Sequence, residues 1–150
     1  DNNICQEGAR ELSTSIHLCT SLTDLRMGGN NISAKGAGCL VEALSKGTAL
    51  RQLDLRGNNI WDEGVQSLTP YLPLFRNLQS LNLRGNKVGV WGAASIAQVL
   101  PKCLHLQRLD LGGNWLGDDG AIKIADCVAL CGSLEYVGLT HNNIRIEGHD

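Results

Sequence analysis

Residues 50–60 read LRQLDLRGNNI, and this stretch decides the fold. Leu53 and Leu55 stand two residues apart, so in an extended chain both side chains point to the same side. They predict a short β-strand with one buried face. Asn58 and Ile60 follow in the turn that leaves this strand. The stretch therefore predicts a strand and a turn.

A different spacing appears in the second half of the unit. Gly36, Leu40 and Leu44 stand four residues apart, and Ala37 and Val41 extend the same pattern. Side chains three and four residues apart share one face of a helix. The second half of the unit is therefore predicted to be a helix with one apolar face.

Both halves recur at an interval of 28 residues along the chain. The asparagine of the turn recurs as Asn2, Asn30, Asn58, Asn86, Asn114 and Asn142. The glycine of the helix recurs as Gly8, Gly36, Gly64, Gly92, Gly120 and Gly148. No insertion interrupts the interval, so the chain is a tandem array of one strand–turn–helix unit.

The two kinds of element differ in width, so the predicted array must bend. Neighbouring parallel strands stand about 4.8 Å apart, whereas packed helices need roughly 8–10 Å. Stacking one strand and one helix per unit therefore puts the strands on the concave side and the helices on the convex side.

Units of this length with the pattern L-x-x-L-x-L-x-x-N resemble leucine-rich repeats. The 28-residue unit with a full helix is similar to the ribonuclease-inhibitor-like subfamily, and above all to the leucine-rich repeat tails of NOD-like receptors. The resemblance implies an α/β solenoid shaped like a horseshoe, with a parallel β-sheet on the concave face and α-helices on the convex face. It also implies that the recurring asparagines satisfy backbone groups in the turns and form a ladder along the stack.

We expect residues 1–150 to form a single domain of four full repeats with partial repeats at both ends. The sequence begins at an asparagine turn and stops within a unit, and neither end resembles a polar capping unit. These features predict a fragment of a longer array.

One helix departs from the pattern, because Pro70 and Pro73 fall within it. Proline lacks an N–H group and its ring clashes with the preceding helical turn. We expect this helix to be short, broken or partly 3₁₀, while Leu78 keeps the register of the array.

The composition excludes several classes of function. The 13 lysines and arginines against 15 acidic residues give a net charge of −2, which excludes a strongly basic nucleic-acid binder. No apolar run approaches the ~18 residues that would span a membrane. We therefore expect a protein partner, with no nucleic acid, no membrane and no evident small-molecule substrate.

Three of the six cysteines, Cys19, Cys103 and Cys131, share one position of the unit, just before the strand. We expect their side chains to point inward as buried free thiols, which places the protein in a reducing compartment, the cytoplasm or nucleus. The alternative is a metal site at Cys127 and Cys131, which lacks a second pair of ligands at suitable spacing. No nucleophile–histidine arrangement or phosphate-binding motif is present, so we expect neither an enzyme nor a cofactor.

Function in repeat arrays lies on the variable outward positions of the concave face. The register assigns to that face Arg26, Asp54, Asn82 and Asp110 in one row, Arg108 and Tyr136 in a second, and Arg56 and Arg84 in a third. Two interpretations stay open here. The face is either solvated and held by intrasheet ion pairs, or its adjacent arginines await an acidic group of a partner.

Three tryptophans, Trp61, Trp91 and Trp115, follow strands in three successive repeats, on one predicted edge of the horseshoe. Other units have mostly small or polar residues at these positions, so the repeat does not require tryptophan there. Tryptophan is enriched among the residues that dominate interfaces. The rings either bind a partner or cover apolar parts of neighbouring loops.

These observations predict a protein-interaction scaffold with a rigid concave face and loop edge. The resemblance implies one alternative, a ligand-sensing or autoinhibitory segment of a NOD-like receptor. A second alternative is similarity to the Ran GTPase-activating proteins, which act through a loop arginine, for which Arg56, Arg84 and Arg145 stand near suitable loops. A ribonuclease inhibitor is disfavoured, because that family alternates two unit lengths.

Overall fold

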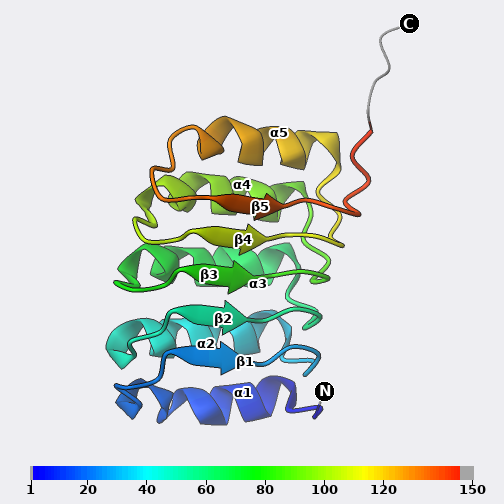
Figure 1. The fold of residues 1–150 in the computed structure, drawn as a ribbon. Coiled ribbons are helices and arrows are strands. Elements are labelled where there is room, and N and C mark those ends of the chain that lie inside the picture. The colour runs from blue at the N-terminus through cyan, green and yellow to red at the C-terminus, as the bar shows by residue number, and fades with distance from the viewer. Residues whose placement is uncertain (1, 146–150) are drawn as a thin grey trace, which may run out of the picture.

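Each 28-residue unit folds into a strand, a turn and a helix, and the units stack in single file (Figure 1). The computed structural model describes residues 2–145, and the predicted helix glycine at Gly148 lies outside them. The strands within that range are β1 (Asp24–Arg26), β2 (Gln52–Asp54), β3 (Ser80–Asn82), β4 (Arg108–Asp110) and β5 (Tyr136–Gly138). The α-helices are α1 (Cys5–Ser13), α2 (Ser33–Gly47), α3 (Trp61–Leu68), α4 (Val90–Val99) and α5 (Gly117–Val128).

The strands form one parallel sheet in the order of the sequence. Leu53 pairs with Leu25 on one side and Leu81 on the other, so each strand pairs with its neighbours at the repeat interval. Leu81, Leu109 and Val137 continue this row. The register therefore places equivalent residues of successive repeats side by side.

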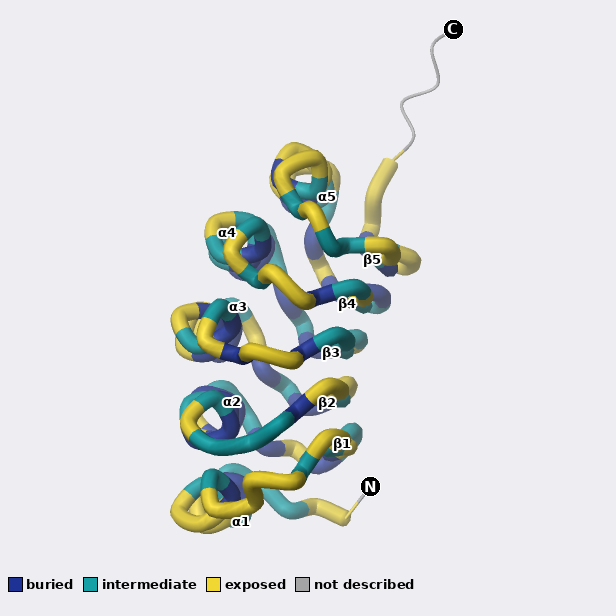
Figure 2. The backbone as a smooth tube through the Cα atoms, turned by 60° about the vertical axis from the view of Figure 1, so that its left-hand side comes forward, coloured by how far each residue is buried: buried dark blue, intermediate teal, exposed yellow. Residues whose placement is uncertain are grey.

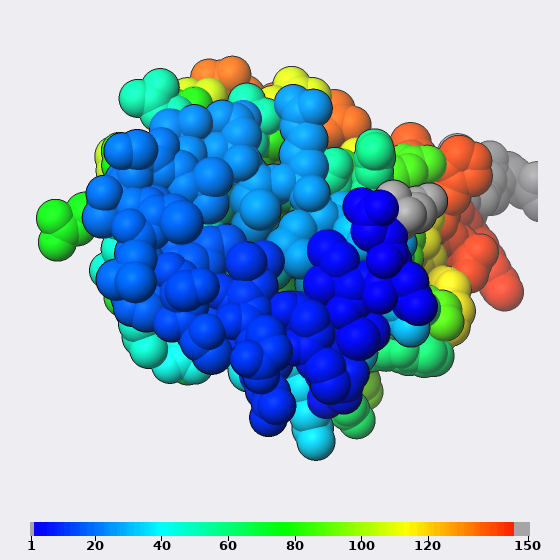
Figure 3. Space-filling view, turned by 90° about the horizontal axis from the view of Figure 1, so that it is seen from below, coloured from blue at the N-terminus to red at the C-terminus, as the bar shows by residue number. Residues whose placement is uncertain are grey.

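The helices lie in one layer and the strands in the other (Figure 2). The helix layer spans a greater length than the strand layer, so the stack curves with the sheet on its inner side, as the difference in element width predicts. Seen from the N-terminal end, the first residues of the chain cover the bottom of the stack (Figure 3). The predicted α/β leucine-rich solenoid is confirmed.

The core between the layers is almost wholly aliphatic. Leu53, Leu55, Ile60, Leu68 and other apolar side chains at the recurring positions are buried. No helix among residues 2–145 has the length and apolar character needed to cross a membrane.

The predicted asparagine ladder is present along the stack. The buried Asn58 donates from Nδ2 to the carbonyl oxygens of Met27 (2.8 Å) and Leu55 (2.9 Å). Its Oδ1 accepts the backbone N–H of Asn30 at 2.9 Å. Each such amide therefore satisfies backbone groups of its own turn and of the preceding turn, which fixes one unit against the next.

The recurring glycine allows the helices to lie close together. A Cβ atom on Gly64 of α3 would lie 2.8 Å from Cα of Ala34 in α2. Any larger residue at this position would push the two helices apart.

The proline-containing helix is broken as predicted. Helix α3 ends at Leu68 and the chain continues as the 3₁₀ helix η2 (Thr69–Leu74), which contains Pro70 and Pro73. A second 3₁₀ segment, η3 (Leu100–Lys102), follows α4 at Pro101, which the sequence analysis did not predict. A further segment, η1 (Ile16–Leu18), follows α1.

Candidate functional site

The register confirms that the predicted concave residues form rows across the sheet. Arg26 pairs with Asp54, Asp54 with Asn82 and Asn82 with Asp110. In the neighbouring row Arg108 pairs with Tyr136. The Cζ atom of Arg108 lies 4.3 Å from the centroid of the Tyr136 ring, so this pair forms a cation–π contact at the β5 end of the face.

Some side chains of this face form hydrogen bonds with the backbone of their own turns. In three units the polar side chain that ends the strand accepts a hydrogen bond from the N–H two residues later. These bonds run from Arg56 to Asp54 (3.1 Å), from Arg84 to Asn82 (3.0 Å) and from Gly112 to Asp110 (2.8 Å). The bonds stabilise the turns, so these side chains have a structural role beside any role in binding.

The side chains of Arg56 and Arg84 lean apart. Arg56 lies over Gly28 of the preceding unit, and its Nε is 3.6 Å from Oδ2 of Asp54. Arg84 crosses Gly112 in the opposite direction and donates from Nη1 to Oγ1 of Thr140 at 3.3 Å. This arrangement favours contacts within the sheet over an arginine pair aimed at a partner.

The tryptophans behave differently from one another. Trp61 is the first residue of α3, and Trp115 lies in the loop before α5. Their ring centroids are 5.3 Å apart at an interplanar angle of 79°, an edge-to-face contact between repeats two apart. The structure thus brings together Trp61 and Trp115, whereas Trp91 on α4 is 70% exposed and is not part of this pair.

A glycine of the repeat between them lies beside this contact. Gly89 stands at the position that Trp61 occupies one repeat earlier, and it lines the same hollow as both rings. The hollow has a volume of about 470 Å³, and the residues around it are Trp61, Asp62, Glu63, Lys87, Gly89 and Trp115. We call these six residues the Trp61–Trp115 site.

A cation of the protein itself contacts the site. Nζ of Lys87 lies 4.7 Å from the centroid of the Trp61 ring. Lys87 stands at the position of Asn59 and Trp115 in the adjacent repeats, so one position of the unit supplies the lysine and one of the two rings. The site is therefore built from three successive repeats.

The backbone around the rings is fixed from both sides. Trp61 has φ +59°, a left-handed conformation that is strained for a large side chain. Its N–H donates to the carbonyl of Asn86 at 2.9 Å. The next residue, Asp62, accepts the N–H of Gly89 on Oδ1 at 2.6 Å. Ser33 has the same conformation one repeat earlier (φ +62°), whereas Gly89 has φ −103° one repeat later.

Each of the two rings is followed in the sequence by a pair of carboxylates. Asp62 and Glu63 lie in the first turn of α3, and Asp118 and Asp119 lie in the first turn of α5. Acidic groups at these positions are stabilised by the N-terminal ends of the helices. The loop edge is therefore aromatic and acidic, with Lys87 as the cation in contact with it.

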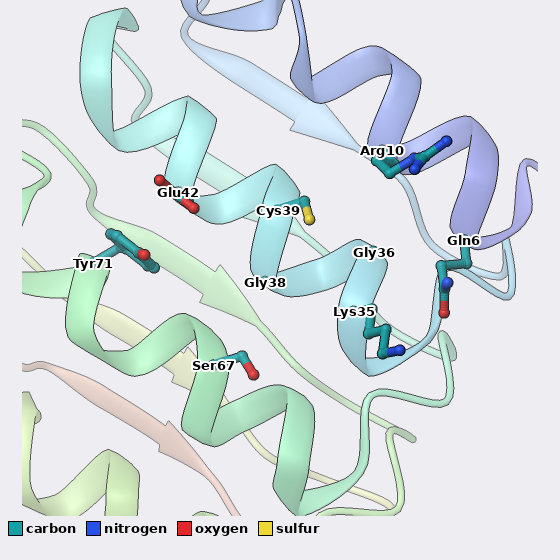
Figure 4. Close-up of a pocket in the computed structure, with 9 residues that line it drawn as sticks. All are labelled: Gln6, Arg10, Lys35, Gly36, Gly38, Cys39, Glu42, Ser67 and Tyr71. Carbon is teal, nitrogen blue, oxygen red and sulfur yellow. The ribbon is translucent and has the colours of Figure 1, made fainter.

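A second hollow, on the helical side, was missed by the sequence analysis. It has a volume of about 470 Å³. Gln6 and Arg10 of α1, Lys35, Cys39 and Glu42 of α2, and Ser67 and Tyr71 of the following helices surround it (Figure 4). The available signal was Gly38, which stands where other units have Arg10, Gln66, Ala94 and Ile122.

The cysteines depart in part from the prediction. Cys103 and Cys131 are half-buried and pack against the core, but Cys19 is exposed. It precedes β1, the first strand of the described sheet. Burial raises the pKa of Cys103 to about 11, which keeps its thiol protonated and unreactive at neutral pH.

The proposed alternative of a metal site receives no support from the geometry. The Sγ atoms of Cys127 and Cys131 donate to backbone carbonyls, those of Ile124 (3.1 Å) and Cys127 (3.2 Å). Within the described part of the chain, no three His, Cys, Asp or Glu side chains lie together as metal ligands would.

Two solved structures share this architecture. One is described as leiomodin-1 actin-binding site 2; it has a TM-score of 0.78 and 18% identity, and the match covers 92% of this chain and 79% of that one. The other is the tropomodulin C-terminal domain of Caenorhabditis elegans, with a TM-score of 0.76, 15% identity, and coverage of 88% and 82%. At these identities the likeness concerns the fold. No curated protein matches the sequence.

The family model described as "Leucine Rich repeat" matches the chain in four segments, residues 18–41, 48–68, 76–97 and 102–125. The segments follow the strand–turn–helix units of the structure and together make up more than half of the sequence. The chain therefore belongs to the leucine-rich repeat family.

Proposed function

We propose that this chain is a protein-binding module that presents the Trp61–Trp115 site to a partner protein. The observation that carries the proposal is the edge-to-face contact of two exposed indole rings, with Trp61 43% and Trp115 51% exposed. The repeat does not require tryptophan at either position, and the strained backbone at Trp61 is retained with the ring in place. Exposed tryptophans held in a fixed geometry are typical of the residues that dominate protein interfaces.

The rigidity of the stack supports this role. The asparagine ladder and the parallel sheet hold the three repeats of the site in one register. A surface that is already ordered loses little conformational freedom when it binds. The rings and carboxylates can therefore act together on a partner without a prior rearrangement.

Variants taken from the repeat itself test the proposal. Trp61→Ser copies Ser33, and Trp115→Asn copies Asn31. Partners captured from an extract of the cells that make the protein are quantified by mass spectrometry for wild type and the double variant. We expect recovery of at least one partner to fall about tenfold or more, the loss of roughly 1.4 kcal/mol or more of binding free energy.

The exposed tryptophan outside the site provides the control. Trp91→Lys copies Lys35 and removes a ring that does not line the hollow, so it should leave the same recovery unchanged. Equal recovery of every partner by wild type and the double variant would contradict the proposal.

Actin is the first named partner to test, because one structure with this fold is described as an actin-binding site. Purified actin is mixed with the chain and binding is measured by analytical ultracentrifugation. Binding that is weakened by the Trp61→Ser, Trp115→Asn double variant would identify actin as a partner at this site. Absence of binding would exclude actin as a partner, and the partner of the module would then be another protein.

A narrower proposal places the chain as a ligand-sensing or autoinhibitory segment of a NOD-like receptor, supported by its constant 28-residue unit. It would act in the cytoplasm or nucleus, with which the six free cysteines are consistent. The sequence of the whole gene tests it, because such a receptor also carries a nucleotide-binding domain.

A further inference from the structure

We propose that the Trp61–Trp115 site receives an arginine side chain of the partner protein. The inference rests on the proposed function, since it names the chemical group that a partner would place at this site. It is carried by the position of Lys87, the arrangement of the rings and the charges around them.

Lys87 shows that the site already holds a cation. Its Nζ lies 4.7 Å from the centroid of the Trp61 ring, within the range of a cation–π contact. Lys87 belongs to the repeat between the two tryptophans. The protein thus places one of its own cations where we infer that an arginine of the partner binds.

The angle between the rings provides two aromatic walls. Trp61 and Trp115 are nearly perpendicular, at 79°, and both border the same hollow. A planar guanidinium group can stack on one indole while its stem packs against the other. Tryptophan gives the strongest cation–π contacts of the aromatic side chains, and arginine is the more frequent cation in them.

The carboxylates select against other ligands. Asp62 and Glu63 border the hollow, and Glu63 is exposed in the first turn of α3. A guanidinium group can donate two parallel hydrogen bonds to one carboxylate. An anionic group would be repelled here, and an apolar group would cover charged side chains without compensating them.

Lys87 competes with an incoming cation for Trp61, which gives the proposal a directional test. Lys87→Asn copies Asn59, which stands at the same repeat position with nearly the same φ, +55° against +60°. The substitution removes the competing cation and its repulsion of the ligand. Binding of an arginine ligand should therefore become tighter, whereas for a merely structural lysine it would weaken or stay unchanged.

The experiment uses the ¹⁵N-labelled chain and the peptide acetyl-Gly-Arg-Gly-amide, followed by NMR of the three indole N–H signals. These are assigned by Trp61→Ser, Trp91→Lys and Trp115→Asn. We expect the peptide to shift the Trp61 and Trp115 signals and to leave the Trp91 signal in place. The same peptide with citrulline for arginine has nearly the same shape without the charge, and should bind at least about threefold more weakly.

Two variants complete the test. Lys87→Asn should tighten binding of the arginine peptide about twofold or more, and Glu63→Gln should weaken it by a similar factor. Equal binding of the arginine and citrulline peptides, equal shifts at all three indoles, or binding that Lys87→Asn weakens or leaves unchanged would overturn the proposal. A circular dichroism spectrum like that of wild type shows that each variant is folded.

The outcomes separate this proposal from the proposed function. One outcome is that partner capture is lost in the Trp61→Ser, Trp115→Asn variant while the arginine peptide does not bind. That result would support the protein-binding module and refute the proposal that the site receives an arginine. Undiminished partner capture in that variant would refute the module even if the peptide bound.

Discussion

The backbone N–H of Asn58 donates to Oδ1 of Asn86 at 2.8 Å, so the side chain of one repeat completes the turn of the preceding repeat. Asn58 serves the preceding repeat in the same way, through Asn30 and the carbonyl of Met27. These contacts are buried. The stability of the array therefore depends on individual amides.

Asn58→Ala should lower the free energy of unfolding by about 2–4 kcal/mol, because it leaves buried carbonyl oxygens and an N–H without partners. The measurement is urea unfolding followed by circular dichroism. Asn77→Ala is the control, since Asn77 is exposed, and should change the free energy by less than about 0.5 kcal/mol. Equal effects of the two substitutions would show that the ladder contributes little.

Gly64→Ala should destabilise the chain by about 2 kcal/mol or more, because the added Cβ would lie 2.8 Å from Cα of Ala34 and force α2 and α3 apart. Gly132→Ala is the matched control, because its Cβ would meet no atom within 4 Å. It should be neutral or slightly stabilising through the unfolded state. Thermal unfolding of both variants tests the prediction, and a higher melting temperature for Gly64→Ala would contradict it.

Trp61→Gly should be more stable than Trp61→Ala by about 1 kcal/mol, because φ is +59° and only glycine adopts it without strain. Both variants lose the contacts with Trp115 and Lys87, so the difference between them isolates the backbone. Urea unfolding provides the measurement. At an ordinary helical φ, alanine is more stabilising than glycine. A higher stability of Trp61→Ala than of Trp61→Gly would therefore show that the backbone at Trp61 is unstrained.

Cys103 should react slowly with iodoacetamide at pH 8, whereas the exposed Cys19 and Cys39 should react faster, as measured by mass spectrometry of the digested protein. Burial raises the pKa of Cys103 from 9.0 to about 11, and the thiolate is the reactive form. Labelling of Cys103 as fast as that of Cys19 in the folded protein would refute this assignment.

The same pKa shift predicts how stability depends on pH. The folded chain keeps the Cys103 proton to higher pH than the unfolded chain, so the unfolded state binds fewer protons between pH 9 and about 11. Stability should therefore fall as the pH rises through that window. Cys103→Ala should make the fall shallower, and an unchanged slope would argue against the shift.

Hydrolysis of GTP by small GTPases should not be accelerated by this chain. Arg56 is next to Asp54 and Arg84 donates to Thr140, so both guanidinium groups already make contacts within the sheet. A phosphate-release assay with Ran and related GTPases checks this. Stimulation that is lost in Arg56→Ala, Arg84→Ala or Arg145→Ala would restore the GTPase-activating alternative.

The sequence predicted the features that repeat. Leu53 and Leu55 define a strand, Asn58 a turn and Pro70 a broken helix, because each signal is local or recurs at a fixed interval. The contact of Trp61 with Trp115 could not be predicted in the same way. It joins side chains of repeats two apart, beside a hollow that the intervening repeat also lines, and therefore involves three units at once.

Other features of the surface also depend on side chains that differ between units. Arg84 reaches Thr140 because Gly112 lies between them without a side chain, and the hollow on the helical side opens beside Gly38. Cys19 is exposed although Cys103, at the same position of the unit, is half-buried. Sequence periodicity identifies what the units have in common, whereas the surface is determined by the residues in which the units differ.

The ladder bonds join equivalent asparagines of adjacent units, and no bond depends on how many units the array contains. A genetic change that adds or removes one whole 28-residue unit would therefore preserve every type of backbone contact. It would nevertheless alter which side chains meet, since loss of the unit with Gly89 would make Trp61 and Trp115 immediate neighbours. Duplication and deletion of units are thus a route by which this scaffold can acquire new specificity without acquiring a new fold.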